Sequence, residues 1–109
     1  MDMTKSECDL ICGKILDFLY GIRNGTEIST TEAFFKVFGA DCLSSCSCTV
    51  EGVEIKNIDF FAIDRAVREN AGTRDLVLDG SKYSNQHLGL PYNVRYVVRK
   101  SHKTKSKGD

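Results

Sequence analysis

Five cysteines are the residues with the clearest capacity for chemistry. Cys8 and Cys12 are four residues apart, and Cys42, Cys46 and Cys48 follow in one short polar stretch. Thiolates bind zinc, but structural zinc sites use closely spaced pairs, and no pair here has the CxxC form. Cys8 and Cys12 are better interpreted as small buried apolar side chains. We therefore keep Cys42, Cys46 and Cys48 as candidates for zinc or redox chemistry and predict no cofactor.

Histidine-based catalysis has little support in this sequence. His87 would need a partner such as Asp79 or a cysteine, and no nucleophile elbow, HExxH motif or paired-carboxylate pattern accompanies it. The glycines at positions 72, 80 and 89 do not lead into a helix as a phosphate-binding loop would. His87 is therefore interpreted as a solvated loop residue, and we predict that the protein is not an enzyme.

Basic residues with tyrosines among them form a further candidate site. The predicted binding residues are Arg65, Arg68, Arg74, Lys82, Tyr92, Arg95, Arg99 and Lys100. Such a set would suit a nucleic acid, because lysine and arginine contact phosphates and aromatic rings stack on bases. The alternative is a solvated face that neighbouring acids, such as Asp64 and Asp79, partly neutralise.

Phenylalanines supply the candidates for contact with a partner. Phe34, Phe35 and Phe38 fall within five residues of each other, so they cannot all face one core. Phe61 falls on the same side of a later helix as Arg65. We expect these four phenylalanines to include contacts to a neighbouring element or to a partner.

Charge is distributed unevenly along the chain. Residues 1–55 hold 4 Lys and Arg against 9 Asp and Glu, whereas residues 56–109 hold 11 against 6. A basic half suits a nucleic acid or an acidic partner, and an acidic half suits a basic surface. No apolar run approaches the length of a transmembrane helix, and residues 1–4 lack the features of a signal peptide. The expected location is the cytoplasm, or the host-cell cytoplasm if a phage encodes the chain.

The elements that position these residues follow from capping boxes and periodicity. Thr4 with Glu7, and Ser29 with Glu32, predict the starts of helices over residues 6–23 and 31–38. A third helix is predicted over 58–71 with Asn57 as its cap, and strands over 76–78 and 93–99. Residues 27–29 read as an extended link, 40–48 as a loop, and 49–55 as a hairpin or a bulged strand. The predicted fold is α+β, with three helices and a small antiparallel sheet in one domain (1–99), followed by a basic tail (100–109).

This order of elements resembles that of a winged helix-turn-helix domain. The resemblance rests on helices 6–23, 31–38 and 57–71, the link 27–29 and a wing over 76–99, and on no sequence motif. In that family the third helix enters the major groove and the wing contacts the backbone. The resemblance implies that Arg65 and Arg68 face bases or phosphates, while Lys82, Arg95 and Arg99 contact the backbone.

A protein-binding module is the alternative from a different class. A short chain with one acidic half, one basic half and no catalytic set could act by docking on another protein, as phage anti-defence inhibitors and antitoxins do. The expected partner is a nucleic acid or another protein and not a membrane. A homodimer is also left open.

Overall fold

The computed structural model describes residues 2–83 and 92–101, which fold into helices and two small antiparallel sheets. The elements are α1 (Lys5–Gly21), β1 (Thr26–Ser29), α2 (Thr30–Phe38), α3 (Ala40–Ser45), β2 (Cys48–Val50), β3 (Val53–Ile55), α4 (Phe60–Asn70), the 3-10 turn η1 (Ala71–Arg74), β4 (Leu76–Tyr83) and β5 (Val94–Lys100). The predicted α+β class is confirmed. Residues 102–109 of the predicted tail, together with His87 and His102, lie outside the described residues.

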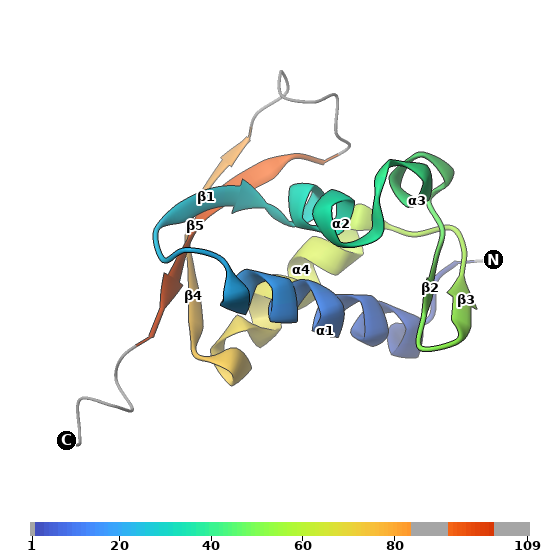
Figure 1. Cartoon of the computed structure of the whole chain (residues 1–109), viewed down its shortest axis with the longest axis horizontal. Coiled ribbons are helices and arrows are strands. Elements are labelled where there is room, and N and C mark those ends of the chain that lie inside the picture. The colour runs from blue at the N-terminus through green and yellow to red at the C-terminus, as the bar shows by residue number, and fades with distance from the viewer. Residues whose placement is uncertain (1, 84–91, 102–109) are drawn as a thin grey trace.

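The two sheets lie at opposite ends of the molecule, with the helices between them (Figure 1). In the larger sheet the strand order is β1-β5-β4, so the last strand of the chain lies between the first strand and β4. The smaller sheet is the hairpin of β2 and β3. Helices α1 and α4 pack against each other along the middle of the molecule.

Hydrogen bonds from capping side chains determine where the helices begin. The Thr4 hydroxyl accepts a hydrogen bond from the backbone N–H of Glu7, and the Glu7 carboxylate accepts one from the N–H of Thr4. Ser29 caps α2 through the N–H of Glu32, as predicted. The predicted cap of the third helix, Asn57, was wrong. Asp59 caps α4 instead, since its carboxylate accepts hydrogen bonds from the backbone N–H groups of residues 61 and 62.

Of the two alternatives for residues 49–55, a hairpin or a bulged strand, the structure has the hairpin. Glu51 and Gly52 form its turn, and both have positive φ, 49° and 83°. Two consecutive residues with positive φ give the tight turn whose twist matches that of the flanking strands.

Three elements differ from the prediction. Strand β4 runs over Leu76–Tyr83, longer than the predicted 76–78, because it continues to pair with β5. Residues 40–45, expected in a loop, form the helix α3, which makes four α-helices among the described residues rather than three. None of the residues of α3 is buried, so the sequence has no apolar stripe to reveal the helix. Residues 27–29 are extended as expected, but they belong to a strand, β1, that pairs with β5.

The core joins both ends of the molecule. Ile11, Ile15 and Leu19, which are spaced four residues apart on one face of α1, are completely buried, and so is Ile63 of α4. Val98 of β5 is buried with them, so a single cluster connects the helices to the larger sheet. No helix within the described ranges combines the length and the apolar character needed to cross a bilayer.

Candidate binding surfaces

Arg95 is held inside the molecule by acids from the first half of the chain. Its guanidinium lies 2.6 Å from the carboxylate of Glu32 and 3.5 Å from that of Glu27, and it donates a further hydrogen bond to the backbone carbonyl of Glu27. The side chains of Arg95 and Glu32 are only 16% and 17% exposed. This arginine therefore joins β5 to β1 and α2 rather than projecting freely into solvent.

Other predicted basic residues are also bonded within the chain. Arg68 pairs with the buried carboxylate of Asp64 at 2.8 Å and lies over the ring of Tyr96. Arg99 pairs with Asp79 at 3.2 Å, as the alternative interpretation of the basic face anticipated for that acid.

Arg74 and Lys100 are engaged as well. Arg74 pairs with Asp17 of α1. The Lys100 ammonium donates a hydrogen bond to the backbone carbonyl of Ile22 and lies over the ring of Tyr20. Within the described residues, Arg65 and Lys82 are the members of the predicted set that have no ion-pair or hydrogen-bond partner.

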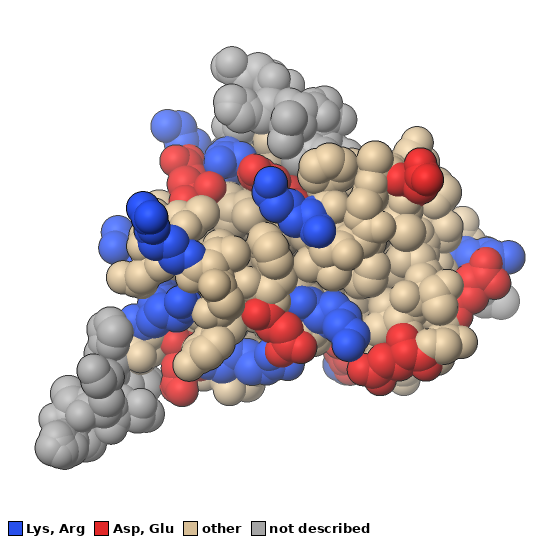
Figure 2. Space-filling model, in the orientation of Figure 1, with Lys and Arg blue, Asp and Glu red and all other residues tan. Residues whose placement is uncertain are grey.

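The charged residues do not form a continuous basic face on the side of the molecule that Figure 2 shows. Lys and Arg lie interspersed with Asp and Glu there, which follows from the pairing described above. The predicted basic residues are thus brought near acids rather than gathered into one phosphate-binding surface.

The phenylalanines divide between core and surface. Phe34 is completely buried, with the rings of Phe38 and Phe60 at 4.7 and 5.0 Å, so its prediction as a partner contact is corrected. It lies on the inward face of α2, where Ala33 is also buried. Phe35 and Phe38 are half-buried. Phe61 lies at the surface, with 50% of its area exposed.

Phe61 is the centre of an exposed aromatic–arginine cluster, which comprises Phe61, Arg65 and Tyr92. The Arg65 guanidinium lies 4.9 Å from the centre of the Phe61 ring, and the Tyr92 ring meets Phe61 edge-on at 5.1 Å. Tyr92 is itself fixed, because its backbone carbonyl accepts a hydrogen bond from the hydroxyl of Thr31. Both geometries are attractive, so the cluster holds an apolar ring in solvent in a defined orientation.

A groove runs between α1 and α4 beside this cluster, and sequence reasoning did not predict it. One hollow of about 370 Å³ has one face of each helix as its walls and is lined by Met3, Thr4, Lys5, Cys8, Asp9, Ala62, Arg65, Ala66, Glu69 and Asn70. A second hollow of about 240 Å³ shares Lys5, Asp9 and Asn70 with the first and continues it toward Arg74. The available signal was the small side chains of Ala62 and Ala66 on one face of α4, near Cys8 of α1. We call the two hollows together the α1–α4 groove.

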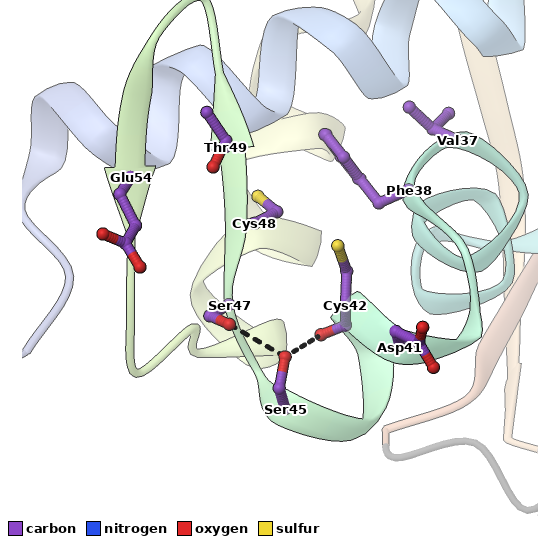
Figure 3. A pocket seen from close by; sticks show the side chains of 9 residues that line it. All are labelled: Val37, Phe38, Asp41, Cys42, Ser45, Ser47, Cys48, Thr49 and Glu54. Atoms are coloured by element: carbon purple, nitrogen blue, oxygen red, sulfur yellow. Dashed lines mark hydrogen bonds between the residues drawn. The ribbon is translucent and has the colours of Figure 1, made fainter.

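The cysteine-rich stretch contributes to a separate pocket of about 420 Å³ between α2, α3 and the hairpin (Figure 3). Cys42 and Cys48 line it together with Phe38, whereas Cys46 does not. The Cys46 thiol instead lies 3.8 Å from the Leu43 carbonyl. No group of three or more Cys, His, Asp or Glu side chains within the described ranges is arranged to hold a metal ion.

Burial makes three of the cysteine thiols, Cys8, Cys12 and Cys48, less acidic. Burial raises the pKa of Cys48 to about 11, with a smaller contribution from the neighbouring Cys42. Burial likewise raises the pKa of Cys12 to about 11 and also raises that of Cys8. Because the thiolate is the reactive form, Cys12 and Cys48 are poor nucleophiles at neutral pH.

Thr30 and Tyr96 form a hydrogen bond between their side chains in the core. The hydroxyls of Thr30 and Tyr96 lie 2.5 Å apart in the core, where burial raises the pKa of Tyr96 well above its ordinary value. This tyrosine therefore stays neutral and acts as a structural tie between α2 and β5.

Three comparisons with known proteins found no match. No family model, no curated protein and no solved structure matches the chain.

Proposed function

We propose that this protein is a non-enzymatic binding domain whose partner is another protein. The observation that carries the proposal is the aromatic–arginine cluster. Phe61 is half exposed yet held in place by Arg65 and Tyr92. Residues that dominate protein–protein binding energy are typically aromatic or arginine, and pre-ordering them lowers the entropy lost on association.

The ion pairs favour a protein partner over a nucleic acid. Arg68, Arg74, Arg95 and Arg99 would each have to leave a carboxylate before binding a phosphate. For Arg95, a half-buried Glu32 would then be left without its partner, which is costly. Of the predicted basic residues in the described ranges, Arg65 and Lys82 remain without an ion-pair or hydrogen-bond partner, and two cations are few for a phosphate-binding surface.

A second candidate function, nucleic-acid binding in the manner of a winged helix-turn-helix, is favoured by the order of the elements. Helix α1, strand β1, helix α2 and helix α4 are followed by the antiparallel strands β4 and β5, which is the order on which the resemblance rests. On this proposal the exposed residues of α4, which are Phe61, Arg65 and Glu69, would face the major groove of DNA. One arginine beside one glutamate is a weak phosphate-binding surface, so this function ranks second.

Two surface variants test the proposal. We expect immobilised wild-type protein to capture one protein from a lysate of its source cells, and Phe61→Ser to lose it. Val77→Ser is the matched control, because Val77 is 47% exposed on β4, away from the cluster. The captured protein is identified by mass spectrometry and its affinity is then measured with purified components.

Nucleic acid is measured in parallel by fluorescence anisotropy with duplex DNA at about 50 and about 200 mM salt. A nucleic-acid-binding protein would lose affinity steeply over that range. Tight, salt-sensitive binding that Arg65→Ala weakens, with no protein partner captured, would overturn the proposal in favour of the second candidate.

A further inference from the structure

We propose that Cys42 and Cys48 are an oxidation-sensitive pair, in which Cys42 reacts first with a peroxide and Cys48 then closes a disulfide that fastens α3 to the hairpin. Cys46 takes no part, although it lies between the two in the chain. The inference goes beyond the proposed function and uses none of the residues of the aromatic–arginine cluster. It follows from the pocket that the two thiols share, from the turn that joins them and from the difference in their burial.

The two thiols line one pocket. The side chain of Cys42 enters it from α3 and that of Cys48 from β2, while Phe38 lines the same pocket (Figure 3). The volume of about 420 Å³ leaves room for a small oxidant beside the sulfur atoms. Cys46 does not line this pocket, and its thiol contacts the Leu43 carbonyl of its own helix at 3.8 Å. The pocket therefore selects two of the three cysteines.

The turn after α3 brings the chain back beside Cys42. The backbone N–H of Ser47 donates a hydrogen bond to the Cys42 carbonyl at 3.2 Å, and the N–H of Cys46 donates one to the Leu43 carbonyl at 3.3 Å. With the left-handed φ of 54° at Cys46, these bonds form a Schellman motif. Cys48 is the next residue, so β2 begins next to the end of α3. Disulfides need Cα atoms about 4.4–6.8 Å apart, and this motif holds the two backbone segments close together.

The two cysteines differ in their access to solvent. Cys42 is half-buried and belongs to a helix that has no buried residue, whereas Cys48 is only 5% exposed. Burial raises the pKa of Cys48 to about 11, and the nearby Cys42 raises it further, since two thiolates close together repel each other. An oxidant from solvent therefore meets Cys42 first, and Cys48 is placed to react with the product.

Two thiols and one hydrogen peroxide molecule balance the reaction. The Cys42 thiolate attacks a peroxide oxygen, so an S–O bond forms and the O–O bond breaks, and the departing hydroxide takes the proton that the thiol released and becomes water. Cys48 then loses its proton and attacks the sulfur of the resulting sulfenic acid. The S–S bond forms, the S–O bond breaks, and the departing hydroxide takes that proton to give the second water. The thiols lose two electrons and the peroxide gains them.

The disulfide would change how α3 is held. None of the residues of α3 is buried, so the helix depends on the hydrogen bonds at its ends. In β2, by contrast, Cys48 and Val50 are both buried in the core. A bond from Cys42 to Cys48 would anchor the helix to this strand. Oxidation would therefore make one wall of the pocket rigid, and reduction would release it.

Mass mapping of the oxidised full chain tests the pairing. The protein is treated with a small molar excess of hydrogen peroxide, denatured, and alkylated with iodoacetamide before digestion. We expect the label on Cys8, Cys12 and Cys46, and on Cys42 and Cys48 only after reduction of the disulfide. A disulfide that includes Cys46, a disulfide between two molecules, or label on all five cysteines without reduction would overturn the proposal.

Two variants separate the steps. Cys46→Ser is the matched control, because Cys46 is in the same stretch but does not line the pocket, and we expect an unchanged yield of disulfide. Cys48→Ala should instead leave a sulfenic acid on Cys42, with about tenfold more dimedone adduct than wild type. Circular dichroism and the melting temperature confirm that each variant is folded. If Cys48→Ala does not fold, wild type and Cys46→Ser decide, and loss of the disulfide in folded Cys46→Ser would overturn the proposal.

Amide hydrogen exchange tests the consequence for α3. In the oxidised protein we expect exchange in α3 to be about tenfold slower than in the reduced protein, because the crosslink suppresses local opening of the helix. Dithiothreitol should restore the faster rate. Equal exchange in fully oxidised and fully reduced protein would overturn the proposal. These measurements need no binding partner, so their failure leaves the proposed function standing.

Discussion

At the scale of single residues, one guanidinium connects three elements. Arg95 of β5 reaches the carboxylate of Glu32 in α2 and both the carboxylate and the backbone carbonyl of Glu27 in β1. Such charge-assisted hydrogen bonds in a half-buried position contribute more to stability than exposed ion pairs do.

We therefore predict that Arg95→Met lowers the free energy of unfolding by roughly 2–3 kcal/mol, because it leaves Glu32 half-buried without a partner. The matched control is Arg99→Met on the same strand and face. Arg99 and Asp79 are 53% and 60% exposed, so the expected loss is below about 1 kcal/mol. Urea denaturation measures both, and equal losses would contradict the prediction.

The thiols offer a second test at this scale. We predict that iodoacetamide near pH 8 modifies the half-buried Cys42 and Cys46 before Cys12 and Cys48, because burial raises the pKa of the latter two to about 11. Peptide mass mapping over time gives the order. In denaturant the five cysteines should react at similar rates, whereas early modification of Cys48 in the folded protein would count against its burial.

At the scale of single residues, the sequence predicted which side chains face the core better than it predicted which residues form ion pairs. Alternation along the predicted strand 93–99 puts Tyr96 and Val98 on one face, and both are buried. Arg95 and Arg99 fall on the other face, as expected. What could not be predicted is that Glu32, 63 residues away in the chain, would lie beside Arg95. That proximity depends on β1 pairing with β5, which no local pattern encodes.

At the scale of elements, local signals determined most boundaries. Capping boxes and apolar stripes act within a few residues, so α1, α2, the hairpin and β5 were predictable. Helix α3 was not, because it buries none of its residues. The extended stretch 27–29 was recognised, but its membership of a sheet was not, because its partner lies near the end of the chain.

The backbone of Glu51 in the hairpin turn is strained, and a substitution can test this. Glu51 has φ of 49°, a left-handed conformation that is unfavourable for a residue with an ordinary side chain. We predict that Glu51→Asn raises the free energy of unfolding by about 0.5–1 kcal/mol, because Asn-Gly is the preferred pair for such a turn. Chemical denaturation measures the gain. Glu54→Asn in β3 is the control, and an equal gain there would show that charge removal and not the turn is responsible.

At the scale of the whole molecule, folding cancels the charge asymmetry of the chain. Asp17, Glu27 and Glu32 come from the acidic first half, and they pair with Arg74 and Arg95 of the basic second half. In the sequence, this charge asymmetry was interpreted as a feature that binds an oppositely charged partner. The structure shows that a part of it holds the two halves of the chain together.

The uneven core predicts an order of local stability. Amide hydrogen exchange should be slowest in the centre of α1, where Ile11, Ile15 and Leu19 are completely buried, and fast in α3, which has no buried residue. Exchange monitored by mass spectrometry or NMR tests this order. Protection of α3 equal to that of α1 would show that the helix at the cysteine pocket unfolds only with the whole molecule.

The hydrogen bond from Arg95 to the carbonyl of Glu27 has a consequence for self-assembly. Strand β1 is an edge of the larger sheet, and unpaired backbone groups at such an edge can template the addition of strands from other molecules. The guanidinium occupies one of these acceptors, so it shields the edge as well as stabilising the fold. Removing Arg95 would free that acceptor, and the variant is expected to aggregate under conditions in which the equally charged Arg99 variant stays in solution.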